Sequence, residues 1–522
     1  MKKTAKLKIK DIRVSAKLIT ALCFAYLYFP LTVFFLTWFR PIVGIPTAAV
    51  LLLLCVRFFV GNDIRNFSKT KTDRKTDDGE YDARINILIL ALTIAAIVLV
   101  LILIGFGGIF PQSGDWYKHN AILKDLVNRD WPVFYYNEGV SLLTYYIGQY
   151  IVPALLGKAT DSVHVAQYVM GLWGMIGVVL VYLLLNCYMK VKNVKETLIN
   201  MFMLLFFSGC LPLAQIVIKI IIGDDMYSIG NYHWILSNGI SLQYRSNLVM
   251  LRWVYPQIIA AWLICLMLEI YKDRIREYCL IMLPLFLFGI YQFLGLAVLV
   301  TLSFVAKILK KELTFKGLIK QIFSISNISV VFTGGVMLLL YYWGNVMSEK
   351  PYSSTLRFQP YIGIDIFVYI FFCLFMFGFH YLSTYKENKN DPFFVPGLFV
   401  LLVLPFAKMG VYNDIVMCTS VPPLFFLCLY SIRTLSSKDK DYSLGMRKGI
   451  LILLIFVGTL FPIMEIRDNV RDNTPGDNMY DEWETMQDFA NRFDDSIPED
   501  VKYNYYTYDI DNSIFTRFLA RR

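Results

Sequence analysis

Charged residues are scarce in this sequence, and they are missing altogether from several long segments. Only 17% of the 522 residues are Asp, Glu, Lys or Arg, whereas 57% are hydrophobic; soluble domains are about a quarter charged. Segments 87–106 and 163–188 contain none of these four residues, and each could cross a bilayer as a helix, which takes about 20 residues. Because these segments are continuously apolar rather than alternating, they predict an all-α polytopic integral membrane protein.

Common catalytic and ligand-binding motifs are absent as well. The sequence has no P-loop, no HExxH, no CxxC and no GxGxxG that follows a strand. Its nine cysteines lie in or beside apolar segments, and their spacing matches neither a zinc site nor a disulfide framework. No charged residue lies in the middle of a predicted span, which argues against an ion-coupled transporter.

The net charge is +10, but the distribution of the basic residues argues against a nucleic-acid partner. Lys and Arg occur in short clusters between the apolar segments, as the positive-inside rule predicts for cytoplasmic loops. The basic N-terminal stretch leads directly into an apolar segment and is typical of a signal-anchor. The expected partner is therefore a lipid bilayer, with the N-terminus in the cytoplasm.

Segment 142–156 decides how the chain is threaded. If it crossed the membrane, the basic clusters 189–195, 272–277 and 307–311 would lie outside; if it does not, all three are cytoplasmic. We therefore expect this segment to be a helix that lies in the outer interface or dips into the membrane. The other apolar segments then predict about thirteen membrane-spanning helices, at 18–38, 42–60, 87–106, 163–188, 197–219, 253–271, 279–289, 293–309, 321–343, 364–383, 393–406, 414–433 and 450–462.

This threading divides the chain into four parts. They are a two-span N-terminal addition, a cytoplasmic linker of mixed charge, a main transmembrane module and a small external tail, at residues 1–60, 61–85, 86–465 and 466–522. The main module carries two long external loops, 107–162 and 220–252. Apart from the linker and the tail, these loops hold the largest concentrations of polar residues, so candidate site residues are sought there.

The first external loop places an acid, an amine and an imidazole at helical spacing. Asp115, Lys118 and His119 span i to i+4 and share one face if the segment is helical. Such a cluster could accept a proton from a hydroxyl group and hold a phosphate. The alternative, which spacing alone favours, is a solvated amphipathic helix capped by Asp115.

The second external loop contains acidic and basic candidates. Asp224, Asp225 and His233 could ligate a divalent metal, although adjacent acids more often end a helix in water. Arg245 and Arg252 are seven residues apart, hence on one face of a helix that enters the membrane. They could bind a diphosphate or a lipid phosphate, or they could anchor the helix to an anionic leaflet.

A third candidate position lies at the outer mouth of a predicted span, where Asn413 and Asp414 precede an apolar segment. A carboxylate at the start of a membrane helix is costly and is often functional. It could equally cap the helix, and both interpretations could hold together.

The order of these features resembles the GT-C superfamily of membrane glycosyltransferases. In that arrangement an outward helix precedes a long external loop with an early acid, here Asp115 in GDWYKHN, followed by interface helices and many spans. The segments YRSNLVMLRWVYPQ, GVYNDIVMCTSVPPL and IDNSIFTRFLAR are similar to bacterial polytopic proteins of this type. Two extra spans and a charged linker before the loop depart from the common layout.

The resemblance implies transfer of a sugar from a polyprenyl phosphate or diphosphate donor, at the outer face of a bacterial plasma membrane, to a glycan, lipid or protein acceptor. Asp115 would be the catalytic base. A divalent metal is a possible cofactor. The candidates for binding the donor phosphate or the substrate are Lys118, His119, Asp224, Asp225, His233, Arg245, Arg252, Asn413 and Asp414.

Other functions remain open for a chain with these features. A flippase or exporter of lipid-linked saccharides would also use external arginines, but it would need a charged central cavity that the apolar spans do not supply. A glycan polymerase or ligase would attack a lipid diphosphate without a base. A non-catalytic membrane scaffold would need no cavity at all.

Overall fold

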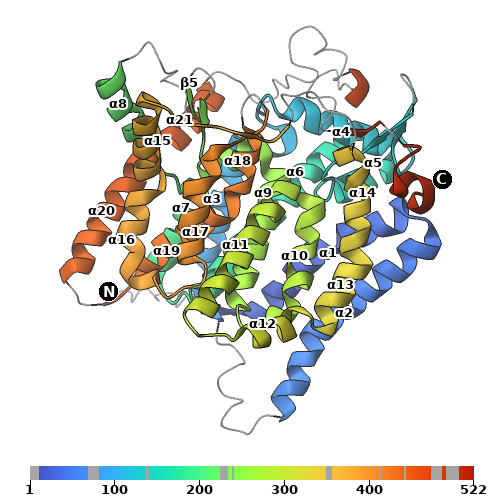
Figure 1. Cartoon of the computed structure of the whole chain (residues 1–522), viewed down its shortest axis with the longest axis horizontal. Coiled ribbons are helices and arrows are strands. Elements are labelled where there is room, and N and C mark those ends of the chain that lie inside the picture. Colours follow the sequence, from blue (N-terminus) through green and yellow to red (C-terminus); the bar gives the residue numbers. More distant parts are fainter. Residues whose placement is uncertain are drawn as a thin grey trace, which may run out of the picture.

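The chain is predominantly helical, as the sequence predicts (Figure 1). The computed structural model describes residues 11–68, 81–136, 140–223, 233–237, 240–347, 355–410, 413–439, 442–471, 485–488, 505–508 and 510–521. The helices up to the central one are α1 (Ala16–Trp38), α2 (Pro41–Ser68), α3 (Ile87–Leu103), α4 (Trp116–Asn128), α5 (Ile151–Thr160), α6 (Val163–Tyr188), α7 (Val194–Phe206), α8 (Leu211–Ile222) and α9 (Asn247–Ile270).

The later helices include several that continue one another through π-helical turns, α13 into α14 and α15 into α16. They are α10 (Tyr278–Phe288), α11 (Ile290–Leu309), α12 (Phe315–Ile322), α13 (Ile325–Val330), α14 (Val336–Met347), α15 (Ile364–Cys373), α16 (Phe379–Asn388), α17 (Phe394–Val403), α18 (Asp414–Thr419), α19 (Val421–Ser436), α20 (Tyr442–Gly458) and α21 (Leu460–Arg471). Short antiparallel pairings join β1 (Asp11–Val14) with β2 (Ala83–Asn86), β3 (Phe134–Tyr135) with β4 (Ser141–Leu143) and β9 (Tyr506–Thr507), β5 (Ile235–Ser237) with β6 (Ile240–Leu242), and β7 (Arg357–Phe358) with β8 (Ala407–Lys408).

The number of membrane-spanning helices is smaller than the sequence predicts. In the described part of the chain, 8 helices are long and apolar enough to cross a membrane, or 9 if the bent pair α7 and α8 forms one span. The prediction of about thirteen is therefore corrected. It counted α3, α10, α17 and α19, which have 17, 11, 10 and 16 residues. A helix rises about 1.5 Å per residue, so these four are shorter than a hydrocarbon core of about 30 Å.

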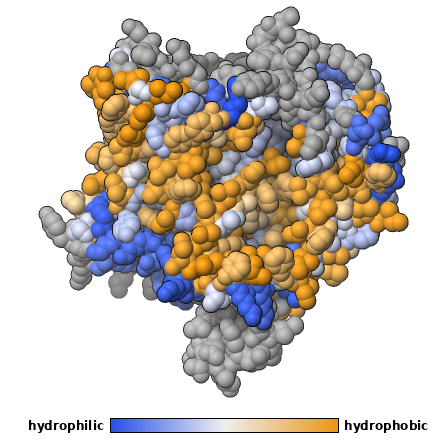
Figure 2. Space-filling view, in the orientation of Figure 1, coloured by the Kyte–Doolittle hydropathy of each residue, from blue (hydrophilic) through white to orange (hydrophobic). Residues whose placement is uncertain are grey.

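Apolar side chains form a broad band across the middle of the molecule, with hydrophilic ones along its lower edge (Figure 2). We call the face that carries α4, α8 and α18 the site face and the opposite face, which carries α12, the basic face (Figure 1). Contacts join the basic clusters at the basic face. The Lys310 ammonium donates to the Lys389 carbonyl at 3.5 Å, and Lys438 pairs with Glu196 at 3.5 Å. Which face is cytoplasmic stays a prediction.

Segment 142–156 contains no membrane-spanning helix in the structure. Its first residues belong to β4, and its last ones begin α5, which has only 10 residues. α5 packs between α4 and α6, and Ile151, Pro153 and Ala154 are buried there. The segment is therefore a packed element at the site face, and its helix is too short to cross a membrane, as predicted.

The two ends of the chain are tied into the bundle. α1 packs against α6 and α10, while β1 pairs with β2, so the N-terminal addition contacts the main module directly. α2 continues to Ser68, past the predicted start of the linker, and residues 69–80 of that linker lie outside the described part. From the C-terminal tail, Tyr506 pairs with Leu143 and the Arg521 amide donates to the Trp38 carbonyl at 2.8 Å.

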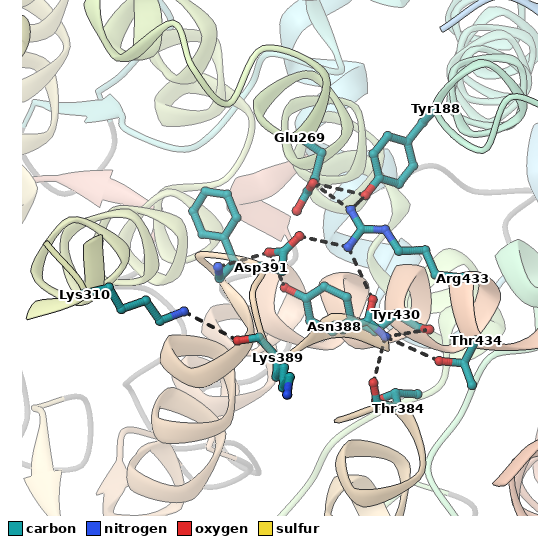
Figure 3. Close-up of polar contacts among 11 residues, drawn as sticks. Tyr188, Glu269, Lys310, Thr384, Asn388, Lys389, Asp391, Tyr430, Arg433 and Thr434 are labelled. Atoms are coloured by element: carbon teal, nitrogen blue, oxygen red, sulfur yellow. Dashed lines mark hydrogen bonds and ion pairs between the residues drawn. The ribbon is translucent and has the colours of Figure 1, made fainter. Parts of the chain in front are cut away.

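A buried ionic network joins four helix ends at the basic face (Figure 3). Arg433 donates to Glu269 at 3.0 Å and to Asp391 at 2.9 Å, and those carboxylates are only 1% and 4% exposed. Tyr188 contacts both Arg433 and Glu269, and Tyr430 donates to Asp391 at 2.9 Å. Glu269 lies one residue before the end of α9, so the network holds the ends of these helices together.

Replacing Arg433 should destabilise the protein strongly. An Arg433→Met variant leaves two buried carboxylates without their counter-ion, a change that typically costs about 3–5 kcal/mol. The apparent melting temperature of the detergent-solubilised protein should therefore fall by several degrees. Adding Glu269→Gln and Asp391→Asn to that variant should recover much of the loss, because the charges are then gone.

The matched control is Lys438→Met, which removes an ion pair whose lysine is 81% exposed and should change the melting temperature little. If Arg433→Met melts like the wild type, or if neutralising both carboxylates recovers nothing, the network does not stabilise the fold by charge.

Candidate functional site

Four charged side chains from distant segments converge at the site face. Asp115 and Lys118 come from the start of α4, Arg245 from the segment before α9, and Asp414 from the start of α18. Lys118 and Asp115 form an ion pair at 3.3 Å, and both Asp115 and Asp414 interact electrostatically with Lys118 and Arg245. We call these four residues the charge cluster. The sequence singled out each member, but it could not bring the three segments together.

The turn from α3 to α4 depends on glycine. Gly105 and Gly107 have φ values of +104° and +76°, which residues other than glycine rarely adopt. The turn also packs tightly on α6, because a Cβ on Gly171 would lie 2.3 Å from the Gly107 nitrogen. This close approach fixes where α4 begins, and with it Asp115.

A proline kink in α9 provides the surface on which α4 is held. Pro256 has no amide hydrogen, so the carbonyl of Arg252, four residues earlier, loses its helical partner; the backbone at Val254 is accordingly non-helical. The Trp116 indole donates to that carbonyl at 3.0 Å, and the Ser113 hydroxyl donates to it at 3.5 Å. These two contacts therefore satisfy the carbonyl that the kink frees, and they position the first turn of α4 at the same time.

Asp115 stands at the N-cap position of α4 but does not cap it. Its side chain makes no capping hydrogen bond and pairs with Lys118 instead. The two side chains are 32% and 18% exposed, respectively, so solvent reaches the pair. The alternative that Asp115 caps the helix through its side chain is therefore wrong. The contact between residues i and i+3, which the spacing predicts, is present.

His119 is an interior residue rather than part of the exposed cluster. Its ring is completely buried, contacts the Tyr150 hydroxyl and lies edge-on to Trp116. Burial, with the nearby charge of Lys118, lowers the pKa of His119 to about 3. The imidazole is therefore neutral at physiological pH and does not offer a positive charge to a phosphate.

Arg245 is held in place while one of its donors stays unpaired. It precedes Ser246, the N-cap of α9, so it does not share a helix face with Arg252, contrary to the expectation from their spacing. Gln243 accepts from its Nε at 3.3 Å and its Nη2 at 3.2 Å, and its guanidinium lies 5.5 Å from the ring centres of Trp234 and Trp253. Within the described residues, its buried Nη1 has no hydrogen-bond partner.

Arg252 and His233 are engaged in a different contact. Arg252 donates to the Glu465 carboxylate at 2.5 Å and to Asn469 at 2.9 Å, and His233 pairs with the same carboxylate at 2.8 Å. Glu465, which no sequence argument identified, thus joins α9 to α21. Arg252 was a candidate phosphate ligand, and in this structure its charge is already compensated.

Asn413 shapes the turn that presents Asp414. It adopts a left-handed conformation with φ of 60°, which asparagine tolerates better than most residues. Its amide donates to the Ala407 carbonyl at 2.8 Å and accepts from the Met409 amide at 3.1 Å. Its own carbonyl accepts from Gln243 at 3.0 Å, which ties the Asp414 turn to the segment that carries Arg245.

The two carboxylates of the charge cluster differ in electrostatic environment. Burial opposes ionisation of Asp115, but the charges of Lys118 and Arg245 outweigh it and hold its pKa below the ordinary value. The Asp414 side chain reaches solvent, yet the protein around it desolvates the carboxylate and raises its pKa. Burial also opposes the charge on Lys118, but Asp115 overcomes this effect and raises the pKa of the lysine. The cluster thus holds two cations and two different carboxylates: Asp115, with a lowered pKa, is the weaker base, and Asp414, with a raised pKa, is the stronger base.

One residue of the C-terminal tail lies beside the cluster. Tyr505, immediately before β9, interacts with Lys118, Asp115 and Asp414, and the Thr144 amide donates to the Tyr505 carbonyl at 2.8 Å. Nothing in the sequence pattern connected this tyrosine with the first loop.

Behind Arg245 a narrow cavity of about 10 Å³, enough for one water molecule, extends between α9 and α19.

The metal hypothesis falls largely outside what the structure describes. Asp224 and Asp225 belong to the undescribed residues 224–232. Among the described residues, no group of three or more His, Cys, Asp or Glu side chains is arranged to hold a metal ion.

Comparison with known proteins finds no matching family model, no matching curated protein and no matching solved structure. The argument for a function therefore starts from the charge cluster itself.

The neutral, buried state of His119 predicts that acid destabilises the protein. The unfolded imidazole has a pKa of about 6.5, whereas the folded one titrates near 3, so between these values the unfolded state binds more protons. Stability should therefore fall as the pH drops below about 6.5, by about 1.4 kcal/mol per pH unit for this group. A His119→Gln variant, whose side chain can still bond Tyr150, should lose stability less steeply between pH 6 and pH 4.

The control is His164→Gln, which changes an exposed imidazole at the start of α6 and should keep the wild-type slope of melting temperature against pH. An unchanged slope in His119→Gln would show that this histidine is not kept neutral by burial.

Proposed function

We propose that this protein is a membrane-embedded glycosyltransferase that moves a sugar from a polyprenyl phosphate or diphosphate lipid to a hydroxyl group of a glycan, lipid or protein acceptor. One observation carries the proposal: Lys118 and Arg245 meet Asp115 and Asp414 at a solvent-accessible place on the site face. Cations suited to a phosphate and carboxylates suited to a proton then lie within one cluster. The resemblance of the first loop to GT-C enzymes points in the same direction.

The cations are suited to the leaving group. When the acceptor oxygen attacks the anomeric carbon, the bond from that carbon to the phosphate oxygen breaks, and negative charge collects on the released lipid phosphate. Arg245 has an unpaired Nη1 donor among the described residues, and Lys118 is kept charged by Asp115. Both can form charge-assisted hydrogen bonds to phosphate oxygens. Attack from the face opposite to the phosphate would invert the configuration of the sugar.

The carboxylates divide into a base and a positioning residue. A general base must be ionised, and it is more effective when its pKa lies closer to the working pH. Desolvation raises the pKa of Asp414, whereas the ion pair with Lys118 lowers that of Asp115. These directions support Asp414 as the group that takes the proton from the acceptor hydroxyl. Asp115, which the resemblance proposed as the base, would then hold Lys118 in place and charged.

Neutralising the base should remove most activity without affecting donor binding. Asp414→Asn should lower kcat by a factor of about 10² to 10⁴, while Asp115→Asn should mainly raise the KM for the donor, because Lys118 loses its partner. The measurement uses purified protein with polyprenyl monophosphate and diphosphate lipids that carry a radiolabelled hexose, together with a membrane glycan extract as acceptor. Wild-type activity should fall on acidification at a pH above the ordinary aspartate pKa, because Asp414 becomes protonated.

The control is Asp161→Asn, an exposed left-handed residue between α5 and α6 where asparagine fits the backbone; it should retain full activity. Equal activity of the wild type and Asp414→Asn would refute the assignment of the base. If the labelled lipid crosses a proteoliposome bilayer intact and no sugar is transferred, the protein is a flippase and the proposed function is wrong.

A further inference from the structure

A separate hollow lies on the basic face, on the opposite side of the molecule from the charge cluster. It has a volume of about 310 Å³ and is bordered by α2, by the turn before α10 and by the junction of α12 and α13. Its size is at the lower end of the range for small-molecule sites, about 300–1,000 Å³. It is distinct from the candidate active site and does not depend on the function proposed for it.

Three cations from three separate elements border this hollow. Arg57 lies on α2, Arg276 in the turn before α10 and Lys320 on α12. All three side chains are exposed, and within the described residues none of them forms an ion pair or a side-chain hydrogen bond. One carboxylate, Glu277, also lines the hollow and accepts from the Ser326 hydroxyl at 2.7 Å. Three positive charges less one negative charge leave +2.

The walls of the hollow are fixed by hydrogen bonds. The Ser324 hydroxyl donates to the Arg276 carbonyl at 2.9 Å and caps α13 by accepting from the Asn327 amide at 3.2 Å. The Asn327 side chain donates to the carbonyls of Ile275 at 3.0 Å and Ile322 at 3.1 Å. These bonds connect the turn before α10 to the α12–α13 junction, so two of the three elements that border the hollow are held together.

The rim of the hollow is apolar and faces outward. Phe323 and Ile325, which line it, are 63% and 73% exposed. α12 is strongly amphipathic: Phe315 and Ile319 are exposed apolar residues on the same short helix as Lys316 and Lys320. A helix of this kind suits the interface between headgroups and acyl chains. A bilayer whose surface followed α12 would present phosphate to the cations and hydrocarbon to the apolar rim.

We infer that this hollow is a binding site for the headgroup of an anionic phospholipid. Arg57, Arg276 and Lys320 would contact the phosphate oxygens through charge-assisted hydrogen bonds, and the acyl chains would pack on Phe323 and Ile325. The local charge of +2 matches a lipid that carries two phosphate groups, such as diphosphatidylglycerol, better than a lipid with one phosphate. A soluble pyrophosphate offers the same charges but cannot use the apolar rim.

The experiment compares these ligands on the delipidated full-length protein in a neutral detergent. Binding is followed by native mass spectrometry and by the shift in melting temperature. Diphosphatidylglycerol should bind more tightly than phosphatidylglycerol, and phosphatidylcholine should bind least. The triple variant Arg57→Gln, Arg276→Gln, Lys320→Gln should bind diphosphatidylglycerol at least about tenfold more weakly.

The matched control removes three exposed basic-face lysines outside the hollow, Lys192→Gln, Lys195→Gln and Lys389→Gln, and should keep wild-type affinity. Equal losses in the two triple variants would mean that only general surface charge attracts the lipid, and the inference would be overturned. Pyrophosphate binding as tight as lipid binding would also overturn it. A Phe323→Asn variant separates these cases further, because it should weaken lipid binding and leave pyrophosphate binding unchanged.

Discussion

The hydrogen bond from the Trp116 indole to the Arg252 carbonyl connects the bundle to the segment in which the candidate site lies. Inside a bilayer a free backbone carbonyl is costly, so a proline in a membrane helix is tolerated only where another group satisfies the carbonyl that it frees. In α9 that carbonyl belongs to Arg252, and the group that satisfies it comes from α4. The same bond therefore permits the kink at Pro256 and fixes the position of Asp115 and Lys118, one and two residues away from Trp116 in the chain.

Two arginines illustrate the difference between a structural and a candidate functional cation. Arg433 donates to two buried carboxylates and contacts a tyrosine, and no atom of its side chain is left buried without a partner. Arg245 is also enclosed, by Gln243 and two tryptophans, yet its Nη1 is left without a partner among the described residues. Leaving a buried donor unsatisfied costs free energy, and a ligand phosphate at this position would recover that cost. The arginine of the ionic network is therefore satisfied and Arg245 is not, although Glu269 of that network also keeps a buried, unpaired Oε1 and Arg252 a buried, unpaired Nε among the described residues.

The sequence predicted some features of the site and missed others for identifiable reasons. The pairing of Asp115 with Lys118 follows from helical spacing, because residues three apart on a helix are neighbours. The pairing of Arg245 with Arg252 on one helix face was wrong, because α9 begins only after Ser246. Segment 142–156 contains no helix long enough to cross a membrane, as predicted, whereas the count of about thirteen spans was too high. Hydropathy finds apolar segments but does not tell an 11-residue buried helix such as α10 from a helix that crosses a bilayer.

By itself, the sequence determined that this is a multi-pass helical membrane protein, whereas the side on which its basic clusters lie stays a prediction. Composition and charge distribution are sufficient for that, because the bilayer imposes one rule on every segment that enters it. Only the tertiary structure decided which polar residues meet: Arg245 and Asp414 beside Asp115 and Lys118, Tyr505 from the tail beside them, and Glu465 between His233 and Arg252. These groups are far apart in the chain, and what brings them together is the packing of helices with similar apolar surfaces, so no local pattern in the sequence specifies their contacts.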